Sequence, residues 1–375
     1  MSLAIETPEE LDLRASVRRL LQDLLGKGDF DYGRPARLLD AWRGMAELGI
    51  FSYPMPGALD GLDGRAAGVL ALLGESGAAL APRALIAGVS AIPRILRSCG
   101  NGDLARGYMS GEMRFAYAQV RYPGDTPPED DRAGRIALDR QDGLSAPPPD
   151  ATHWLIGIRP QDPSLSQVLC LDAAGLASRL RPVWLVDGTP AAGLLQLPAH
   201  ILPGEILERG ADAARILDDA EDWAAAAAVA DALGAATAGF DLTREYLLQR
   251  HQFGRPLSSF QAIQHTMACA YAQLEQLRSM VMLCASCLDA SAALRGYSIA
   301  SARVYLASAG VSLLEKCIQV SGGVGVSDEY RLGHYYKRVL ASCSLHGTTQ
   351  AYRHTIDAGI RRQLKEEEQD EAYTP

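Results

Sequence analysis

The feature that most constrains this 375-residue chain is a series of long, proline-free helical stretches in its C-terminal half. The stretch from Glu221 to His251 has one strongly apolar face, and Ser258–Leu288 and Ser291–Val320 follow it. Consecutive helical segments of about 30 residues are typical of an antiparallel bundle. The sequence therefore predicts a C-terminal helical bundle domain over residues 206–375.

The N-terminal part has the pattern of a second helical unit. Apolar residues from Leu11 to Leu25 and from Leu38 to Leu48 follow helical spacing, and Gly26 and Gly49 are placed to end these helices. We therefore expect an N-terminal helical domain over residues 1–111.

The middle of the chain, residues 112–205, has a different pattern. Short apolar stretches alternate with proline, glycine and aspartate, which predicts strands at Arg114–Val120, Thr152–Ile158, Ser166–Leu171 and Gly193–Leu197. This part is expected to form a small middle β domain. The predicted fold class is therefore α+β and mainly α.

The composition of the chain limits the kinds of partner that it is expected to bind. The chain has 36 Lys and Arg against 45 Asp and Glu, a formal charge of −9, which argues against general nucleic-acid binding. Met1–Glu10 lacks the apolar region of a signal peptide, and the sequence shows no uninterrupted apolar run of membrane-spanning length. We expect a cytoplasmic protein with no membrane partner.

The seven cysteines are scattered, and only Cys284 and Cys287 form a CxxC pair. No second pair and no nearby histidine completes a metal site around them. The interpretation as two small buried residues on a helix is favoured over a redox or metal-binding role. We expect reduced thiols and no metal.

Three motifs occur in order along the predicted bundle. They are Arg250–Leu257 (RHQFGRPL) followed by Phe260-Gln261, then Gln319–Gly325 (QVSGGVG), then His346–Gln350 (HGTTQ). In this order, and with the helix–strand–helix organisation, the chain resembles the acyl-CoA dehydrogenase family. The resemblance implies that the C-terminal bundle is a four-helix bundle. The resemblance covers the whole chain and is strong in the bundle, moderate in the N-terminal part and weak in the middle.

The resemblance implies FAD at a subunit interface, where the bundle of one subunit reaches the adenosine and pyrophosphate part of a cofactor held by a neighbour. The matching residues and their implied roles are Arg250 at the pyrophosphate, Phe253 packing on the cofactor, Gln319 as a hydrogen-bond donor, Gly322 and Gly323 for close backbone approach, and Thr348 and Gln350 on the adenine side. Taken singly, Arg250 could be a favourable charge at a helix C-terminus, and the glycines could form an ordinary turn between helices.

The base expected of the family is absent. The resemblance implies a carboxylate that removes an α-proton while a hydride passes from the β-carbon to the flavin. Its usual position, just before Gly-Thr, holds His346; the alternative position on the first bundle helix holds Ala224. The arginine that meets the acyl-CoA chain is replaced by Ala225. Asp222 keeps a polar residue of that region and is the candidate substrate-binding residue.

His346 has two interpretations. An imidazole can act as a base near neutral pH, which makes His346 the candidate catalytic residue; a structural role at a lost site is favoured. Glu221 as a displaced base is disfavoured, because it lies one helical turn from the alternative position.

The flavin-ring segment also departs from the family. Ala116–Asp125 lacks the threonine of that motif, and Trp154–Ile156 is the nearest counterpart of a second flavin-ring stretch. We therefore expect that the part of the site that holds the isoalloxazine ring is degraded in this chain. The residues donated to a neighbour's cofactor are expected to be retained.

Two functional hypotheses follow. The favoured one is a base-lacking partner subunit of a heteromeric FAD-dependent acyl-CoA dehydrogenase, an arrangement that the resemblance associates with bacterial enzymes of steroid side chains. The alternative is a homotetrameric acyl-CoA dehydrogenase with His346 as an altered base, or a non-catalytic relative. The expected partners are an acyl-CoA of fatty acid or steroid side-chain metabolism, a related subunit in a homo- or hetero-tetramer, and an electron-transfer flavoprotein.

Overall fold

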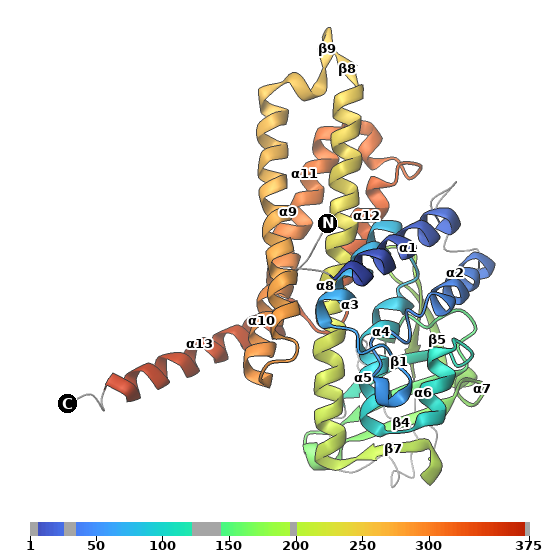
Figure 1. The fold of residues 1–375 in the computed structure, drawn as a ribbon. Coiled ribbons are helices and arrows are strands. Elements are labelled where there is room, and N and C mark those ends of the chain that lie inside the picture. The colour runs from blue at the N-terminus through green and yellow to red at the C-terminus, as the bar shows by residue number, and fades with distance from the viewer. Residues whose placement is uncertain (1–6, 26–34, 122–143, 196–200, 372–375) are drawn as a thin grey trace.

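The computed structural model describes residues 7–25, 35–121, 144–195 and 201–371. Its longest element is helix α8, which runs through the middle of the molecule and contacts most of the other parts (Figure 1). The N-terminal helices pack on one side of α8 and the strands lie near its N-terminal end. The predicted α+β, mainly helical fold class is confirmed, while the predicted domain boundaries stay predictions.

Within the described residues, the N-terminal part contains six α-helices. They are α1 (Pro8–Leu25), α2 (Pro35–Glu47), α3 (Ala66–Ala79), α4 (Ala84–Val89), α5 (Ala91–Cys99) and α6 (Gly102–Met109). The two helices expected from apolar spacing correspond to α1 and α2; Gly26 lies outside the described residues. Residues of α3, α4 and α5 join α8 in one continuous hydrophobic core, so the N-terminal helices and the bundle are not separated by a polar layer.

Two small sheets follow. A four-stranded sheet has the order β1-β3-β4-β7, with β1 (Phe115–Arg121) parallel to β3 (His153–Arg159) and the other pairs antiparallel; β4 is Gln167–Asp172 and β7 is Ile206–Arg209. A three-stranded antiparallel sheet has the order β2-β6-β5, formed by Leu144–Ser145, Pro190–Leu194 and Leu180–Trp184. The short helix α7 (Ala173–Leu176) follows β4.

The strands alternate their side chains between two cores, as their pleat requires. Ala116, Ala118 and Val120 of β1 face a small apolar cluster shared with the second sheet. Phe115 and Tyr117, on the other face of β1, belong to the main core around α8. Tyr117 is thereby turned toward the bundle.

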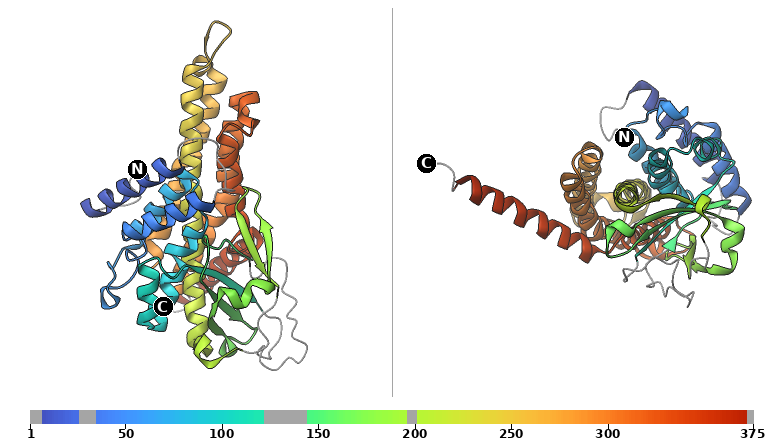
Figure 2. Two further views of the ribbon diagram at one scale, coloured as in Figure 1. Left: turned by 90° about the vertical axis from the view of Figure 1, so that its right-hand side faces the viewer. Right: turned by 90° about the horizontal axis from the view of Figure 1, so that it is seen from below.

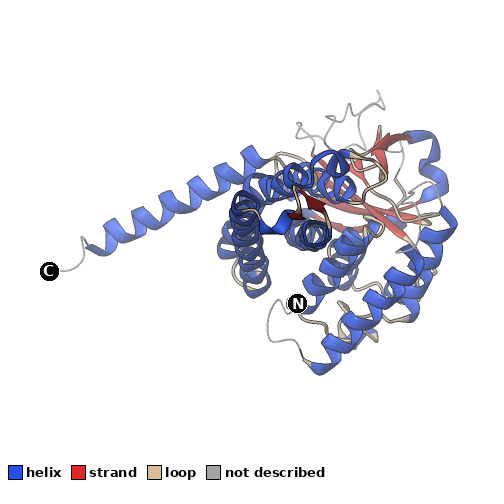
Figure 3. Cartoon of the chain, turned by 90° about the horizontal axis from the view of Figure 1, so that it is seen from above, coloured by secondary structure: helices blue, strands red, loops and turns tan. Residues whose placement is uncertain are grey.

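The bundle consists of long helices, as the proline-free stretches predict. They are α8 (Gly210–Gln249), α9 (Gln261–Cys287), α10 (Ala292–Tyr305), α11 (Val311–Ser321), α12 (Leu332–Ser344) and α13 (Thr349–Glu371). A five-residue π-helical segment, Leu306–Gly310, separates α10 from α11, so the predicted helix over Ser291–Val320 is interrupted. Helix α13 projects away from the rest of the molecule (Figures 2 and 3).

The apolar side chains of helix α8 are accounted for by its burial inside the protein. Its most apolar 18-residue window has a mean hydropathy of 1.3, and the helix is long enough to cross a membrane, but 89% of that window is buried inside the protein. The run Ala224–Ala228 is 0–2% exposed at every position. Small side chains here let the neighbouring helices approach closely.

The closest approach is between α3 and α8. A Cβ on Gly77 would lie 1.7 Å from the carbonyl oxygen of Asp231, and a Cβ on Gly234 would lie 1.8 Å from that of Gly74. Neither distance is possible for real atoms. Glycine at Gly77 and Gly234 is therefore a packing requirement, and the two helix backbones leave no gap along this line.

Buried ion pairs join the three parts of the chain. Arg338 of α12 binds Asp231 of α8 through two hydrogen bonds of 2.7 and 2.8 Å, and both side chains are 0% exposed. Arg83, between α3 and α4, binds Asp187 of the β5–β6 turn at 2.7 Å and donates to Ser342. These bonds hold the β part, the N-terminal helices and the bundle in one arrangement.

A further charged contact fixes α1, and it gives a stability prediction. Glu10 accepts hydrogen bonds from Arg65 and, at 2.7 Å, from the hydroxyl of Tyr53. Chiefly because of Arg65, the pKa of Glu10 is lowered to about 2. A carboxyl whose pKa is depressed by folding stabilises the protein above its unfolded pKa of about 4.5 and loses this contribution as pH falls toward 2.

We expect Glu10→Gln to lower the free energy of unfolding at pH 7 by about 1–2 kcal/mol, a value discounted because Arg65 is half exposed. At pH 3 the difference from wild type should shrink to less than half. Urea unfolding followed by circular dichroism at both pH values measures it. An equal difference at pH 7 and pH 3 would contradict the linkage.

Candidate functional site

The loop between α12 and α13 holds His346 in a constrained position. His346 has φ +58° and Gly347 has φ +105°, both in the left-handed region. Arg303 of α10 donates to the carbonyl oxygens of Ser342, at 2.7 Å, and of Leu345. The hydroxyl of Tyr352 donates to the carbonyl of His346. The loop is thus fixed by its own chain, and the imidazole is directed toward α8.

On α8 the imidazole meets a carboxylate. Nδ1 of His346 lies 3.3 Å from Oε1 of Glu221, and the two side chains are 17% and 21% exposed. Burial raises the pKa of Glu221, whereas the charge of the neighbouring His346 and its hydrogen bond lower it. The lowering effects outweigh burial, so the net pKa is below the usual value. The structure therefore brings together two titratable groups that sequence reasoning had treated separately.

A cavity of about 300 Å³ lies beside this pair. Its described lining includes Arg83, Tyr117, Gln119, Arg121, Glu221 and His346. The hydroxyl of Tyr117 is buried and has no hydrogen-bond partner among the described residues, and burial raises its pKa. An unmet donor of this kind is costly unless a ligand satisfies it.

Strand β1 is tied to α8 beside the cavity. With its amide turned to suit its neighbours, Gln119 donates to Oε2 of Glu221 at 3.0 Å and accepts from Arg159 at 3.1 Å. Arg159 also pairs with Asp218 at 2.5 Å. Gln119 of β1 and Arg159 of β3 thus already make polar contacts with α8 beside the cavity.

The positions implied to face substrate are closed. Ala224 and Ala225 are 0% and 2% exposed inside the main core. Asp222 pairs with Arg295 of α10 at 2.7 Å and does not belong to the cavity lining. Trp154 lies in the small core between the two sheets. None of these residues reaches the cavity, and residues 122–125 of the flavin-ring segment lie outside the described residues.

The other candidate residues gather at the far end of the bundle. Arg250 ends α8, and a hairpin of β8 (His251–Gln252) and β9 (Arg255–Pro256) follows it at the top of Figure 1. Phe253, at the hairpin turn, is 90% exposed with φ +53°. We call the set Arg250, Phe253, Gln319, Gly322 and Gly323 the bundle tip.

The second segment of the bundle tip follows α11. Gln319 is exposed in the last turn of α11, and Gly322 and Gly323 begin a short 3-10 helix, η8 (Gly322–Val326). A Cβ on either glycine would meet nothing within 4 Å, so the backbone here is open to an outside group. Beyond η8, the ring of Tyr330 lies 6.2 Å from that of Tyr246 on α8.

The predicted cofactor residues fall into two groups. Thr348 and Gln350 are exposed at the start of α13, close to His346, and not at the bundle tip. From Glu221 to Arg250, α8 spans about 40 Å at 1.5 Å per residue. One extended dinucleotide does not cover that length, so the two groups of one chain would serve two different cofactor positions.

The bundle tip fits the phosphate-bearing part of a dinucleotide. It offers a guanidinium, open glycine backbone and an exposed aromatic ring. At the cavity, the unmet hydroxyl of Tyr117 fits one polar ligand atom, but Gln119 of β1 and Arg159 of β3 are already bonded to α8 beside it. The fit to FAD is therefore good at the bundle tip and poor at the cavity.

The thiols show no reactive environment. Cys284 and Cys287 are buried on α9, and burial raises the pKa of Cys284 to about 12. Within the described ranges, no three His, Cys, Asp or Glu side chains are grouped to hold a metal ion.

The signal that could have connected Glu221 to the site was helix geometry. Glu221 precedes Ala224 and Ala225 by three and four residues, so all three share one face of α8. The side chains at Glu221 and at the implied base position, Ala224, therefore project from the same face of α8. An offset of one helical turn was thus a weak reason to disfavour Glu221 as a residue of the site.

Comparison with known proteins gives a family match in the helical bundle. A family model, "Acyl-CoA dehydrogenase, C-terminal domain", matches residues 217–360. IpdE2 of Mycolicibacterium smegmatis, an acyl-CoA dehydrogenase, is 30% identical over 171 residues, which are 46% of this chain and 51% of IpdE2. FadE34 of Mycobacterium tuberculosis, also an acyl-CoA dehydrogenase, is 27% identical over 90% of this chain and 45% of its own length.

The chain thus spans about half the length of the curated relatives it matches. Among solved structures, the ChsE4–ChsE5 complex of Mycobacterium tuberculosis has a chain that is 21% identical, with complete coverage of both chains and a TM-score of 0.75. At this identity the likeness establishes the fold alone.

Proposed function

We propose that this chain, whose residues 217–360 match the model of the acyl-CoA dehydrogenase C-terminal domain, is the base-lacking partner subunit of a heteromeric, FAD-dependent acyl-CoA dehydrogenase. The complete neighbouring subunit removes the α-proton of the acyl-CoA, and FAD, when bound, accepts the hydride from the β-carbon. This chain supplies the bundle tip to that cofactor. A tetramer and an electron-transfer flavoprotein as electron acceptor belong to the same proposal.

The observation that supports the proposal most is that the two ends of α8 differ in how accessible their candidate residues are to a partner. The bundle tip is exposed and makes its polar and aromatic groups available to an outside partner. Toward the other end, Ala224 and Ala225 are 0% and 2% exposed and are covered by the chain's own core. The substrate-facing surface implied by the family is filled, whereas the donated surface is free.

Each residue of the bundle tip has a defined task in this proposal. The Arg250 guanidinium donates to oxygens of the pyrophosphate, and the Gln319 amide donates beside it. Gly322 and Gly323 bring backbone N–H groups close to the same oxygens without a Cβ in the way. Phe253 covers the cofactor and loses its exposure to water in doing so.

The lengths of the relatives support a partner. FadE34 matches 90% of this chain with only 45% of its own length, so it is long enough to contain a second unit of this size. The ChsE4–ChsE5 structure is a complex of two differently named proteins. Both are compatible with a chain that acts beside a related unit.

The Glu221–His346 pair favours a second candidate, a homotetrameric enzyme with an altered base. Glu221 holds Nδ1 of His346 at 3.3 Å, which leaves Nε2 as the nitrogen available to a ligand. The unmet hydroxyl of Tyr117 lines the same cavity. In this candidate, His346 takes the α-proton and Glu221 orients the ring and balances its positive charge.

Co-expression with a complete related subunit separates the two candidates. We expect Arg250→Met and Gly323→Val to lower the FAD retained by the complex at least tenfold, since they remove a charged hydrogen bond or block the open backbone. His346→Ala should leave FAD content and turnover within twofold of wild type. Arg244→Met, an exposed arginine nearer the middle of α8, is the matched control.

The readout is the flavin absorbance per protein after gel filtration, together with acyl-CoA turnover. Loss of turnover in His346→Ala, with FAD retention unchanged in the bundle-tip variants, would favour the altered base and contradict the partner-subunit role.

A further inference from the structure

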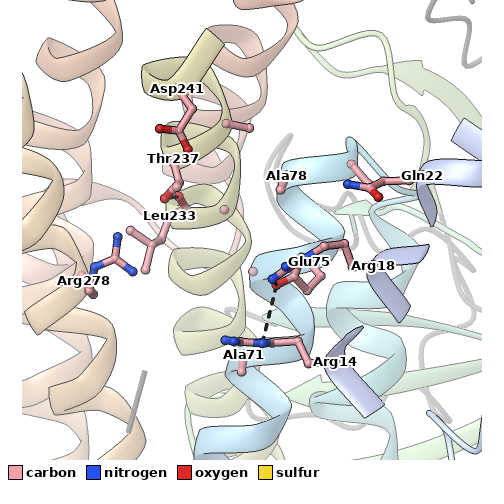
Figure 4. A pocket seen from close by; sticks show the side chains of 14 residues that line it. Arg14, Arg18, Gln22, Ala71, Glu75, Ala78, Leu233, Thr237, Asp241 and Arg278 are labelled. Carbon is pink, nitrogen blue, oxygen red and sulfur yellow. Dashed lines mark hydrogen bonds and ion pairs between the residues drawn. The ribbon is translucent and has the colours of Figure 1, made fainter. Parts of the chain in front are cut away.

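A second cavity lies between the N-terminal helices and the bundle, away from both ends discussed above. It has a volume of about 360 Å³ and is bounded by α1, α3, α8 and α9 (Figure 4). Gly74 and Gly234, which belong to the α3–α8 contact, form part of its wall. The volume is within the range of small-molecule sites, at its lower end.

The cavity contains a buried guanidinium with an unused donor. Arg278 of α9 is 8% exposed, and its Nε donates to Glu275 at 3.3 Å. Its Nη2 is buried without a hydrogen-bond partner in the described part of the chain. Figure 4 shows the Arg278 side chain extending from α9 toward Leu233 and Thr237 of α8. A buried charged donor without an acceptor is unfavourable, so an acceptor brought by a ligand would be bound strongly.

On the opposite side the charges are already matched. Arg18 binds Glu75 through two hydrogen bonds of 2.6 and 2.8 Å, and Arg14 lies 3.7 Å from the same carboxylate. Asp241 lies 3.4 Å from Arg244. Because Glu75 and Asp241 are paired with arginines, Arg278 is the cation of the described lining whose charge is least compensated, and a single negative charge is its best complement.

Apart from Gln22 and Thr237, the remaining wall is small and apolar. Ala71, Ala78, Leu233 and Ala238 contribute methyl and methylene groups, and the glycines contribute bare backbone. Such a wall suits the apolar body of a ligand better than a fully hydrated inorganic anion, because it offers few hydrogen bonds.

We propose that this cavity binds a small organic carboxylate. The carboxylate accepts from Nη2 of Arg278, and the apolar body lies against Ala71, Ala78 and Leu233. Because the ligand contacts α3, α8 and α9 together, it stabilises the packing of the N-terminal helices on the bundle. This site is independent of the subunit role proposed above and shares no lining residue with the cavity at His346.

Benzoate is a suitable probe, with benzamide as its neutral analogue and inorganic phosphate as an anion without an apolar body. Isothermal titration and thermal unfolding of the purified full-length chain should show saturable binding of benzoate and a rise in midpoint temperature. Benzamide and phosphate should bind at least about tenfold more weakly, because each lacks one of the two complementary features.

Arg278→Met, which keeps the length of the side chain without its charge, should weaken benzoate binding at least about tenfold. Arg215→Met, an exposed arginine at the start of α8, is the matched control and should bind as wild type. If Arg278→Met does not fold, the benzoate–benzamide difference in the wild-type chain decides. Equal binding of benzoate and benzamide, stronger binding of phosphate, no benzoate binding, or unchanged benzoate binding in a folded Arg278→Met would each overturn the proposal.

Discussion

An Asp231→Ala variant is expected to lose about 3–5 kcal/mol of unfolding free energy, because it leaves the Arg338 guanidinium charged and uncompensated in the core. Both side chains are 0% exposed and joined by two hydrogen bonds. Arg338 also donates to the carbonyl of Ala81 at 2.8 Å, so the guanidinium cannot simply turn out to solvent. The measurement is the urea midpoint and slope by circular dichroism.

The double variant Asp231→Leu/Arg338→Met separates a lost interaction from a stranded charge. Replacing a buried ion pair by apolar side chains of similar volume is often close to neutral, so we expect it to regain at least half of the stability lost in Asp231→Ala. A double variant as unstable as the single one would mean that shape at this site matters more than charge.

Gly234→Ala is the second large effect, with an expected loss of about 3 kcal/mol. A Cβ here would lie 1.8 Å from the carbonyl oxygen of Gly74, so the two helices must separate. Gly74→Ala is the matched control in the same contact, because its Cβ would meet only the carbonyl of Ala230 at an ordinary 4.0 Å. We expect the control to stay within about 1 kcal/mol of wild type, helped by the higher helix propensity of alanine.

Urea unfolding of the two variants side by side tests the closure of this face of α8. Equal stability of Gly234→Ala and Gly74→Ala would show that α3 and α8 can move apart at little cost.

Most of the helices and strands could be predicted from local patterns in the sequence. The proline-free stretches predicted α9 nearly to its ends and the C-terminal end of α8, but α8 begins at Gly210, well before the predicted start at Glu221. Short apolar stretches between turn residues predicted β1, β3 and β4. Strand β5 was missed because Pro182 and its exposed residues break the expected pattern. The interruption between α10 and α11 was also missed, since a π-helical segment leaves the apolar spacing almost unchanged.

The candidate site was less accessible to sequence reasoning, because its parts are far apart in the chain. His346 was singled out by its motif, but its contact with Glu221 depends on how α8 and the α12–α13 loop pack. The link between Arg83 and Asp187 has the same origin, since no local pattern relates the two residues. What the motifs could not show is that the third of them, with Thr348 and Gln350, lies far from the bundle tip.

The two halves of the molecule therefore support different roles. The bundle tip keeps an open, phosphate-binding type of surface, and the cavity end keeps a charged pair with little room around the implied substrate positions. A chain with this division is suited to complete a cofactor site on a neighbour.

The most direct test of the central claim is the FAD content of this chain, alone and in complex. The flavin absorbance spectrum and protein content are measured for the chain expressed by itself and for the complex with a complete related subunit. The account predicts a colourless chain on its own and one FAD for each pair of subunits in the complex. A yellow chain that carries one FAD per subunit without a partner, and whose flavin is reduced by an acyl-CoA, would contradict it.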